Sequence, residues 1–365
     1  QDNLFSAVSR SGKKTAISAY YWFEKLVPQA AVNARFYTPG DDRAADREVV
    51  DAAIKMLADP STALVLIHLD QVDYAGHHEG GPRDIQWNEA AARADGLLAE
   101  ILAQLDLQKD TLLVVSDHGH IDQGGHGGPD PAALVEPFVL AGAGVKPGTY
   151  GDVNMVDVSP TAAALLGAGL PASTQGRVLS EMLALPAATL NKLSEATRAQ
   201  QSTLAQAYIK AIGQPVSENQ LSTVDAVKDY QDLIQSAITA RLTGERIPRG
   251  LLSLALAAAG VWLLARQAKR SILFWLIGSL VAVGLFHLRF AVLDGKPYSL
   301  SGVTGTIDLI LYAAVTTALS LVIGYGVAAF GLGYFKHRPG AAAEGTMKFI
   351  LVNIGLLALP VLVHF

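Results

Sequence analysis

The sequence predicts an α/β domain with a mostly parallel sheet flanked by helices, followed by a helical stalk and an all-α transmembrane bundle. Three observations carry this prediction. Short apolar runs that end in polar residues alternate with a helical segment in the first half of the chain. A polar stretch rich in Ala, Gln, Leu and Lys follows. Long apolar stretches separated by short polar joints fill the last third.

The predicted strands are short, apolar and β-branched, which is typical of parallel strands buried on both faces. They cover residues 63–70, 111–117 and 137–141. Between the first two, residues 85–105 repeat their apolar positions at helical spacing, so a βαβ crossover is expected. Ligands bind beyond the carboxyl ends of such strands, which makes the polar, Gly- and His-rich segments 70–81 and 117–128 the predicted site.

Composition divides the chain into three predicted parts. Residues 1–185 form a partial α/β metal-binding domain, residues 186–248 a helical linker or stalk, and residues 249–365 a transmembrane domain. A mean hydropathy of +0.29 with only 17% charged residues is too apolar for an ordinary soluble protein of this length. The pattern of the stalk predicts two amphipathic helices with a break near residues 213–215.

About four membrane helices are expected in the last part of the chain. The candidate spans are residues 251–265, 272–290, 307–335 and 349–365. About 20 residues cross the hydrocarbon, and shorter or longer spans are accommodated by thinning or tilt. Basic residues follow the first and third spans more densely than the second, although three arginines also precede the first span. This asymmetry predicts an integral membrane protein with its N-terminal α/β domain on the extracytoplasmic face.

Charge and cysteine content exclude other classes. A net charge of −5 gives no basic footprint for nucleic acid. The chain has no cysteine, so disulfides and thiolate ligands are ruled out, and any metal is held by His, Asp or Glu. The first residues, Gln1 onward, read like the middle of a domain, and we expect further sequence upstream.

A cluster of histidines and aspartates fills the two predicted site segments. Asp73 and His77 are expected on one tight loop, and Asp117 and His118 at the end of the next strand. His126 lies between glycine pairs, whose backbone freedom lets it reach back to the same place. Oxygen and nitrogen ligands of this kind suit Zn²⁺ and, less specifically, Mn²⁺. The expected ligands are Asp73, His77, Asp117, His118 and His126.

Three further histidines in these segments have no assigned role. For His68, His78 and His120 a loop histidine bonded to the backbone is the simpler interpretation. A pair of metals held by the five expected ligands would polarise a phosphoryl oxygen and stabilise the leaving oxygen of an in-line displacement.

These motifs resemble the alkaline phosphatase superfamily, in the branch of type I phosphodiesterases and nucleotide pyrophosphatases. The resemblance rests on Asp73-xxx-His77 with Gly76, on Ser116-Asp117-His118-Gly119 and on Gly125-His126-Gly127-Gly128. The spacing from Asp117 to His126 is similar to that of the membrane-bound ethanolamine-phosphate transferases of glycolipid-anchor synthesis. Residues 156–161, 165–167 and 171–177 resemble the closing motif of the same domain, so the likeness covers roughly residues 1 to 180.

The resemblance implies two divalent metal ions, zinc or manganese. Asp73, His77 and His126 would hold one, and Asp117 and His118 would belong to the other. The family's second metal also needs an Asp from the first strand, and its nucleophile is a Thr or Ser that forms a phospho-enzyme. Both are expected upstream of residue 1. Nearby hydroxyls do not replace the nucleophile, because they lie where the family has an ordinary helix leading to the second strand; these are Ser9, Ser11 and Thr15.

The predicted function is therefore a membrane-anchored, metal-dependent phosphodiesterase or phospho-group (phosphoethanolamine-like) transferase. Its partners would be the lipid bilayer, a lipid, glycolipid or nucleotide-like phosphodiester, and other membrane proteins. Two alternatives stay open. One is a catalytically inactive accessory or structural subunit of a membrane complex that retains the fold. The other is a sulfatase or phosphomutase of the same superfamily, which the spacing from Asp117 to His126 disfavours.

Overall fold

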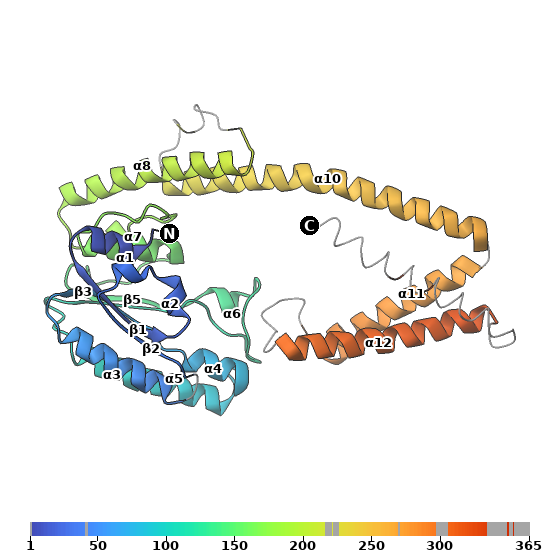
Figure 1. Cartoon of the computed structure of the whole chain (residues 1–365), viewed down its shortest axis with the longest axis horizontal. Helices are drawn as coiled ribbons and strands as arrows, with labels where there is room; N and C mark the ends of the chain where they lie inside the picture. The colour runs from blue at the N-terminus through green and yellow to red at the C-terminus, as the bar shows by residue number, and fades with distance from the viewer. Residues whose placement is uncertain are drawn as a thin grey trace. The chain divides into compact units, whose positions relative to one another are not determined.

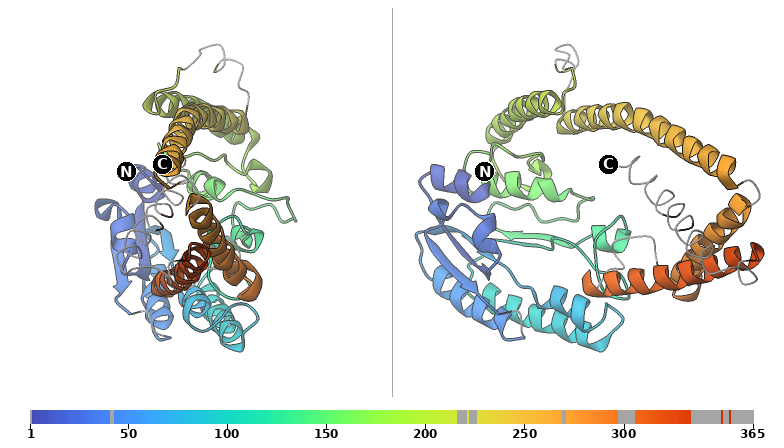
Figure 2. Two further views of the ribbon diagram at one scale, coloured as in Figure 1. Left: turned by 90° about the vertical axis from the view of Figure 1, so that its right-hand side faces the viewer. Right: turned by 45° about the vertical axis from the view of Figure 1, so that its right-hand side comes forward.

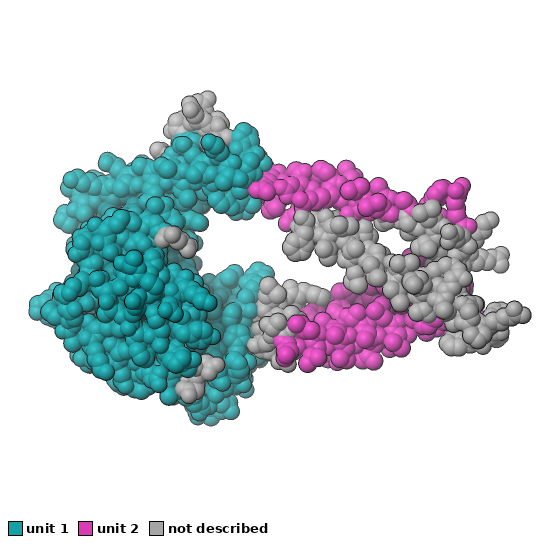
Figure 3. Space-filling model, viewed as in Figure 1, with its two compact units in different colours: residues 1–238 teal, residues 239–365 magenta. Residues whose placement is uncertain are grey.

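The computed structural model describes residues 2–40, 43–215, 221, 226–268, 271–296, 306–333, 349 and 353. The chain divides into two compact units, Gln1–Ile238 and Thr239–Phe365 (Figure 3). The boundary between them falls within a single long helix, α10 (Val227–Ala268).

The first unit is built on a three-stranded parallel sheet (Figure 1). Strand β1 (Lys14–Tyr20) lies in the middle, with β2 (Ala34–Thr38) on one side and β3 (Thr62–Ile67) on the other. After its first residue β1 is buried throughout, as expected for a central strand of a parallel sheet. The predicted α/β class with a parallel sheet flanked by helices is confirmed.

Two further strands form a separate antiparallel pair. Strand β4 (Thr111–Val115) pairs with β5 (Phe138–Gly142), and Thr111 lies opposite Gly142. The prediction that β3 and β4 form a βαβ crossover within one sheet is wrong for the residues described. The order strand, helix, strand is present, but β3 hydrogen-bonds to β1 and β4 to β5. The sequence alone did not show which strand pairs with β3 and which with β4.

Helices cover both faces of the parallel sheet (Figures 1 and 2). Helix α1 (Leu4–Arg10) packs on β1 and on α7 (Val158–Leu165), while α3 (Ala45–Leu57) packs on all three strands and on α5 (Ile85–Leu102). The cores on the two faces are apolar. Val8 and Ala163 are buried together on the first, and Val50, Leu97 and Ile101 on the second.

The remaining short elements of the first unit connect these layers. They are α2 (Phe23–Leu26), η1 (Gln29–Ala31), α4 (Gln71–His78), α6 (Pro131–Leu134), η2 (Met155–Asp157) and η3 (Ser180–Met182). Helix α8 (Ala187–Ala211) follows and ends before Gly213, which takes a positive φ of 73°. The next long helix, α10, continues through Pro248 to Ala268, so the predicted span at residues 251–265 is part of this helix and not a separate one.

Two described helices are long and apolar enough to cross a membrane. They cover Leu273–Leu293 and Ile310–Gly331, with mean hydropathies of 2.0 and 1.8. The first combines α11 (Ser271–His287) with a π-helical turn, η4 (Leu288–Leu293), and the second belongs to α12 (Thr306–Gly331). Gly278 and Gly324 face each other where the two helices meet, and a Cβ on either would strike the carbonyl oxygen of the other. The fourth predicted span, residues 349–365, lies outside the described residues apart from Phe349 and Asn353.

Candidate metal centre

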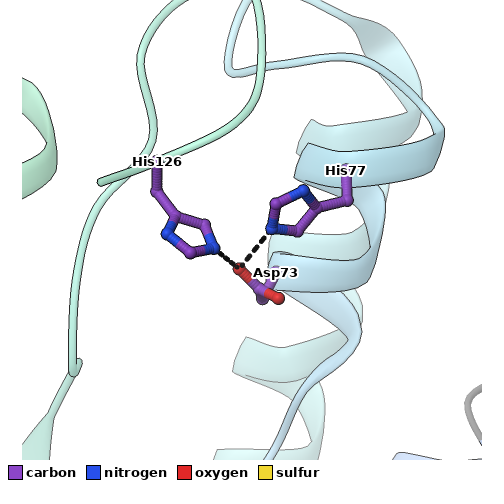
Figure 4. A group of neighbouring side chains, drawn as sticks. All are labelled: Asp73, His77 and His126. Carbon is purple, nitrogen blue, oxygen red and sulfur yellow. Dashed lines mark ion pairs between the residues drawn. The ribbon is translucent and has the colours of Figure 1, made fainter. Parts of the chain in front are cut away.

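The segment that carries Asp73 and His77 is the helix α4, not the tight loop that we expected. The spacing of four residues places both side chains on one face of the helix. The Nε2 atom of His77 lies 3.6 Å from Oδ1 of Asp73 (Figure 4). Gly76 and the short length of the segment favoured a loop, but the hydrogen-bonded turn that begins at Asp70 continues to His78.

A buried carboxylate fixes the start of α4. Asp46 of α3 is 2% exposed, and it accepts hydrogen bonds from the backbone N–H groups of Asp70 (2.9 Å) and Gln71 (3.3 Å). The hydroxyl of Tyr20, at the end of β1, donates to the same carboxylate at 2.9 Å. Burial and the neighbouring Asp46 carboxylate raise the pKa of Tyr20 well above its usual range, so this hydroxyl stays a donor. The core thus holds the helix that carries Asp73, a role that no sequence motif indicated.

His126 reaches the site on a glycine-rich loop, as the sequence predicts. The flanking glycines have positive φ angles, 84° at Gly124, 81° at Gly125, 90° at Gly127 and 78° at Gly128. The N–H of Gly125 donates to the carbonyl oxygen of Gly76 at 3.0 Å. This bond ties the loop directly to α4.

Four imidazoles converge on one carboxylate oxygen. Oδ1 of Asp73 lies 3.2 Å from Nε2 of His120, 3.5 Å from that of His126, 3.6 Å from that of His77 and 3.7 Å from that of His118. The rings of His118 and His126 are stacked with centroids 3.8 Å apart. Two groups of three ligand atoms result, Asp73 with His77 and His126, and Asp73 with His118 and His120.

The five predicted ligands are thus unequally placed. Asp73, His77, His118 and His126 lie together, whereas Asp117 is at the surface with its side chain 77% exposed. Asp117 still borders the site, because its Oδ2 is 3.7 Å from Nε2 of His118.

The three histidines without an assigned role behave differently from one another. His78 stacks on Tyr74 and its Nδ1 lies 3.0 Å from the Tyr74 carbonyl oxygen, as expected of a histidine bonded to the backbone. His68 packs edge-on or tilted against the aromatic rings of Tyr20 and Phe23, and burial lowers its pKa. His120 differs from both, because its Nε2 lies 3.2 Å from Oδ1 of Asp73.

The charge states of the cluster suit cation binding. Burial pushes the pKa of Asp73 upward, but the adjacent imidazoles of His120, His77 and His118 lower it by more, so the carboxylate stays ionised. Burial lowers the pKa of His126, and the neighbouring imidazoles add to this effect. A neutral imidazole beside an ionised carboxylate is the state in which both act as metal ligands.

The donor set and its spacing fit a metal ion. Oδ1 of Asp73 and Nε2 of His120 are buried, and neither makes a hydrogen bond of ordinary geometry within the described part of the chain. Two ligand atoms about 2.0–2.1 Å from a tetrahedral zinc ion lie about 3.3 Å apart. The separations of 3.2 to 3.7 Å around Asp73 are close to this value. Imidazole nitrogen with carboxylate oxygen is also the usual ligand chemistry of zinc.

Hydroxyls near the start of the chain are bound to backbone, as expected of structural side chains. Thr15 is fully buried and its Oγ1 donates to the carbonyl oxygen of Ala31 at 2.5 Å. Ser11 Oγ donates to the carbonyl oxygen of Val8 at 2.6 Å. Neither is available as a nucleophile in this structure.

Comparisons with known proteins cover the segment that carries the cluster. Residues 2–129, which include the whole cluster, match the family model of type I phosphodiesterase / nucleotide pyrophosphatase. The catalytic subunit of human GPI ethanolamine phosphate transferase 3 is 28% identical over 196 residues, which cover 50% of this chain and 17% of that protein.

Two fungal relatives show the same pattern. GPI ethanolamine phosphate transferase 3 of Eremothecium gossypii is 32% identical over 133 residues, covering 32% of this chain and 13% of the relative. GPI ethanolamine phosphate transferase 2 of Aspergillus fumigatus is 25% identical over 157 residues, which cover 38% of this chain and 20% of that protein. The chain therefore spans about a fifth or less of the length of these relatives.

Proposed function

We propose that this chain, whose residues 2–129 match the type I phosphodiesterase / nucleotide pyrophosphatase family, is a membrane-anchored, metal-dependent phosphodiesterase or phospho-group transferase. Its substrate would be a lipid, glycolipid or nucleotide-like phosphodiester. The names of the similar proteins, GPI ethanolamine phosphate transferases, favour a phosphoethanolamine-like group and a glycolipid among these.

The convergence of imidazoles on Oδ1 of Asp73 carries the proposal. In it, Asp73, His77 and His126 hold one divalent metal ion, and Asp117 and His118 belong to a second. Zinc is the preferred ion and manganese is accepted. A metal pair supplies polarisation of a phosphoryl oxygen and stabilisation of the attacking and leaving oxygens of an in-line displacement.

The chain's own residues prepare this chemistry by charge and position. Asp73 keeps its negative charge because the surrounding imidazoles hold its pKa below the usual range. His126 stays neutral because burial lowers its pKa. Asp46 and the Gly125–Gly76 backbone bond hold the two ligand-bearing segments against each other. The proposal assigns no nucleophile to the described residues.

The membrane part of the proposal rests on the C-terminal helices. Two apolar helices, Leu273–Leu293 and Ile310–Gly331, support anchoring in a bilayer. The excess of basic residues after the first and third predicted spans supports an extracytoplasmic site. Anchoring in a bilayer suits a lipid-phosphate substrate, and other membrane proteins are candidate partners.

The test is metal content together with phosphodiester hydrolysis. We would purify the full-length protein carrying this sequence in detergent, measure bound zinc and manganese, and assay bis(4-nitrophenyl) phosphate. His77→Ala and His126→Ala should each reduce the rate by more than the ~10–100-fold that loss of an outer-shell partner costs. His78→Ala is the matched control, because His78 lies beside His77 on α4 and bonds to backbone instead of the cluster.

The opposite result would reject the enzyme. If the protein binds neither zinc nor manganese, and hydrolysis is absent or insensitive to both substitutions, the chain does not act through this site. The accessory-subunit alternative would then be the better account.

A further inference from the structure

We propose that His120 is a metal ligand and that Asp73, His118 and His120 together form a second cation site within this chain. Asp73 is shared with the group that contains His77 and His126, and Asp117 lies at the edge of the site. The inference rests on the proposed metal-dependent function and goes further, because it gives the second cation three ligands from the described residues.

His120 is the most enclosed member of the cluster. Its side chain is 4% exposed, and its Nε2 makes the shortest of the four approaches to Oδ1 of Asp73, at 3.2 Å. Within the described residues both atoms lack a hydrogen bond of ordinary geometry. A buried polar atom left in this state is unfavourable, because its lost hydration is not replaced. A cation bound to both would remove that cost for both.

The fold leaves room for this ring at one glycine. A Cβ on Gly76 of α4 would overlap Nε2 and Cδ2 of His120 and would lie 2.8 Å from its Cε1. Any other residue at position 76 would therefore push the imidazole away from Asp73, one turn earlier on the same helix. The absence of a side chain at Gly76 thus leaves the room on α4 that the His120 ring occupies.

Main-chain bonds hold the loop around His120 in place. The N–H of Gly119 donates to the carbonyl oxygen of Ala133 at 3.1 Å, and the N–H of Ile121 donates to that of Gly125 at 3.3 Å. A Cβ on Gly119 would strike the carbonyl oxygen of Ala132. The backbone is thus fixed on both sides of the imidazole, which makes the approach to Asp73 a property of the fold.

His118 completes the group. Its Nε2 is 3.7 Å from Oδ1 of Asp73 and equally 3.7 Å from Oδ2 of Asp117. The ligand atoms of Asp73, His118 and His120 all lie within 4.8 Å of one another, as do those of Asp73, His77 and His126. A carboxylate shared by two such groups would hold two cations side by side, the arrangement that two-metal phosphoryl chemistry uses.

The test counts imidazole ligands directly. In the full-length protein loaded with Co²⁺, each imidazole bound through Nε2 gives one hyperfine-shifted, exchangeable Nδ1–H proton resonance. The four converging imidazoles predict four such resonances in the wild type and three in His120→Met. Methionine fills similar space with a weaker ligand atom, so the affinity for the second Co²⁺ should fall at least ~10-fold. His78→Met should keep all four resonances and the wild-type affinity.

The outcomes separate this inference from the proposed function. If the wild type shows three resonances and His120→Met changes neither the spectrum nor the Co²⁺ stoichiometry, His120 is not a ligand. In that case, hydrolysis that depends on His77 and His126 still supports the proposed enzyme. If the wild type binds no Co²⁺ and hydrolyses nothing, both fail. Should His120→Met not fold, the wild-type count of four against three decides the question alone.

Discussion

Replacing Gly76 by alanine tests the position of the His120 ring. Alanine in place of a helical glycine normally stabilises a protein by about 0.5–1 kcal/mol. At position 76 the added Cβ would overlap the His120 ring, and forced overpacking costs about 1–3 kcal/mol. The overlap is not easily relieved, because the ring is buried and the loop on either side is held by backbone bonds.

Gly96 on α5 offers a matched control. A Cβ added there meets nothing within 4 Å, so Gly96→Ala gains the helix propensity without the overlap. The two variants should therefore differ by about 2 kcal/mol, which is about 4–8 °C in melting temperature for a unit of this size. Thermal unfolding of the metal-free protein measures the difference, and zinc titration should show an affinity at least ~10-fold weaker in Gly76→Ala only.

The reasoning is refuted if Gly76→Ala melts as high as Gly96→Ala and binds zinc like the wild type. That result would mean that the His120 ring does not occupy the space above Gly76.

Three further predictions concern the same centre. Asp46→Asn should lower unfolding stability by about 1–3 kcal/mol and weaken zinc binding, because Asp46 accepts the Asp70 N–H and the Tyr20 hydroxyl; denaturant unfolding and zinc titration measure both. The pKa of His126 is lowered in the folded state, so the unfolded chain binds the extra proton first as pH falls below about 6.5. The metal-free protein should therefore lose melting temperature below that pH, and His126→Gln should flatten the dependence. Zinc at 100 times its Kd should stabilise the wild type by about 2.7 kcal/mol, with EDTA reversing the effect and Asp73→Asn abolishing it in thermal unfolding.

The local features of the fold were predictable because they depend on short-range pattern. The apolar runs that became β3, β4 and β5 were identified to within a few residues, since buried strands need continuous β-branched and apolar sequence. The pairing of β4 was not predictable in the same way. Its partner, β5, lies beyond the glycine-rich loop, and nothing in the local sequence of β4 distinguishes a parallel neighbour from an antiparallel one.

The error at α4 has a similar origin. We expected Asp73 and His77 on a tight loop, and Gly76 in the same segment weakens an isolated helix. In the fold, Gly76 leaves room for the ring of His120, which belongs to a different segment. The spacing of Asp73 and His77 already had the period of a helix face, and it was the better signal of the two.

The sequence analysis assigned His120 no role, because its spacing from His118 indicates nothing by itself. Two side chains that are two residues apart in a loop can point in the same direction or in opposite directions. Between the two histidines, Gly119 approaches Ala132 and Ala133 so closely that a side chain would not fit there. That contact joins two segments and cannot be read from the local sequence.

The electrostatics of the cluster favour a bound cation, independently of any similarity to other proteins. A carboxylate oxygen has two lone pairs and accepts about two hydrogen bonds, so four imidazoles cannot all donate to Oδ1 of Asp73. An imidazole that does not donate presents its own nitrogen lone pair to a negative oxygen, which is repulsive. Protonating all four imidazoles would instead place like charges beside one another. The lowered pKa of His126 already reflects this repulsion between neighbouring imidazoles. Without a cation, both the fully neutral and the fully protonated set of imidazoles leave repulsion in a partly buried place. We expect a divalent ion between these nitrogen and oxygen atoms to convert the same contacts into attraction and so to stabilise the folded chain.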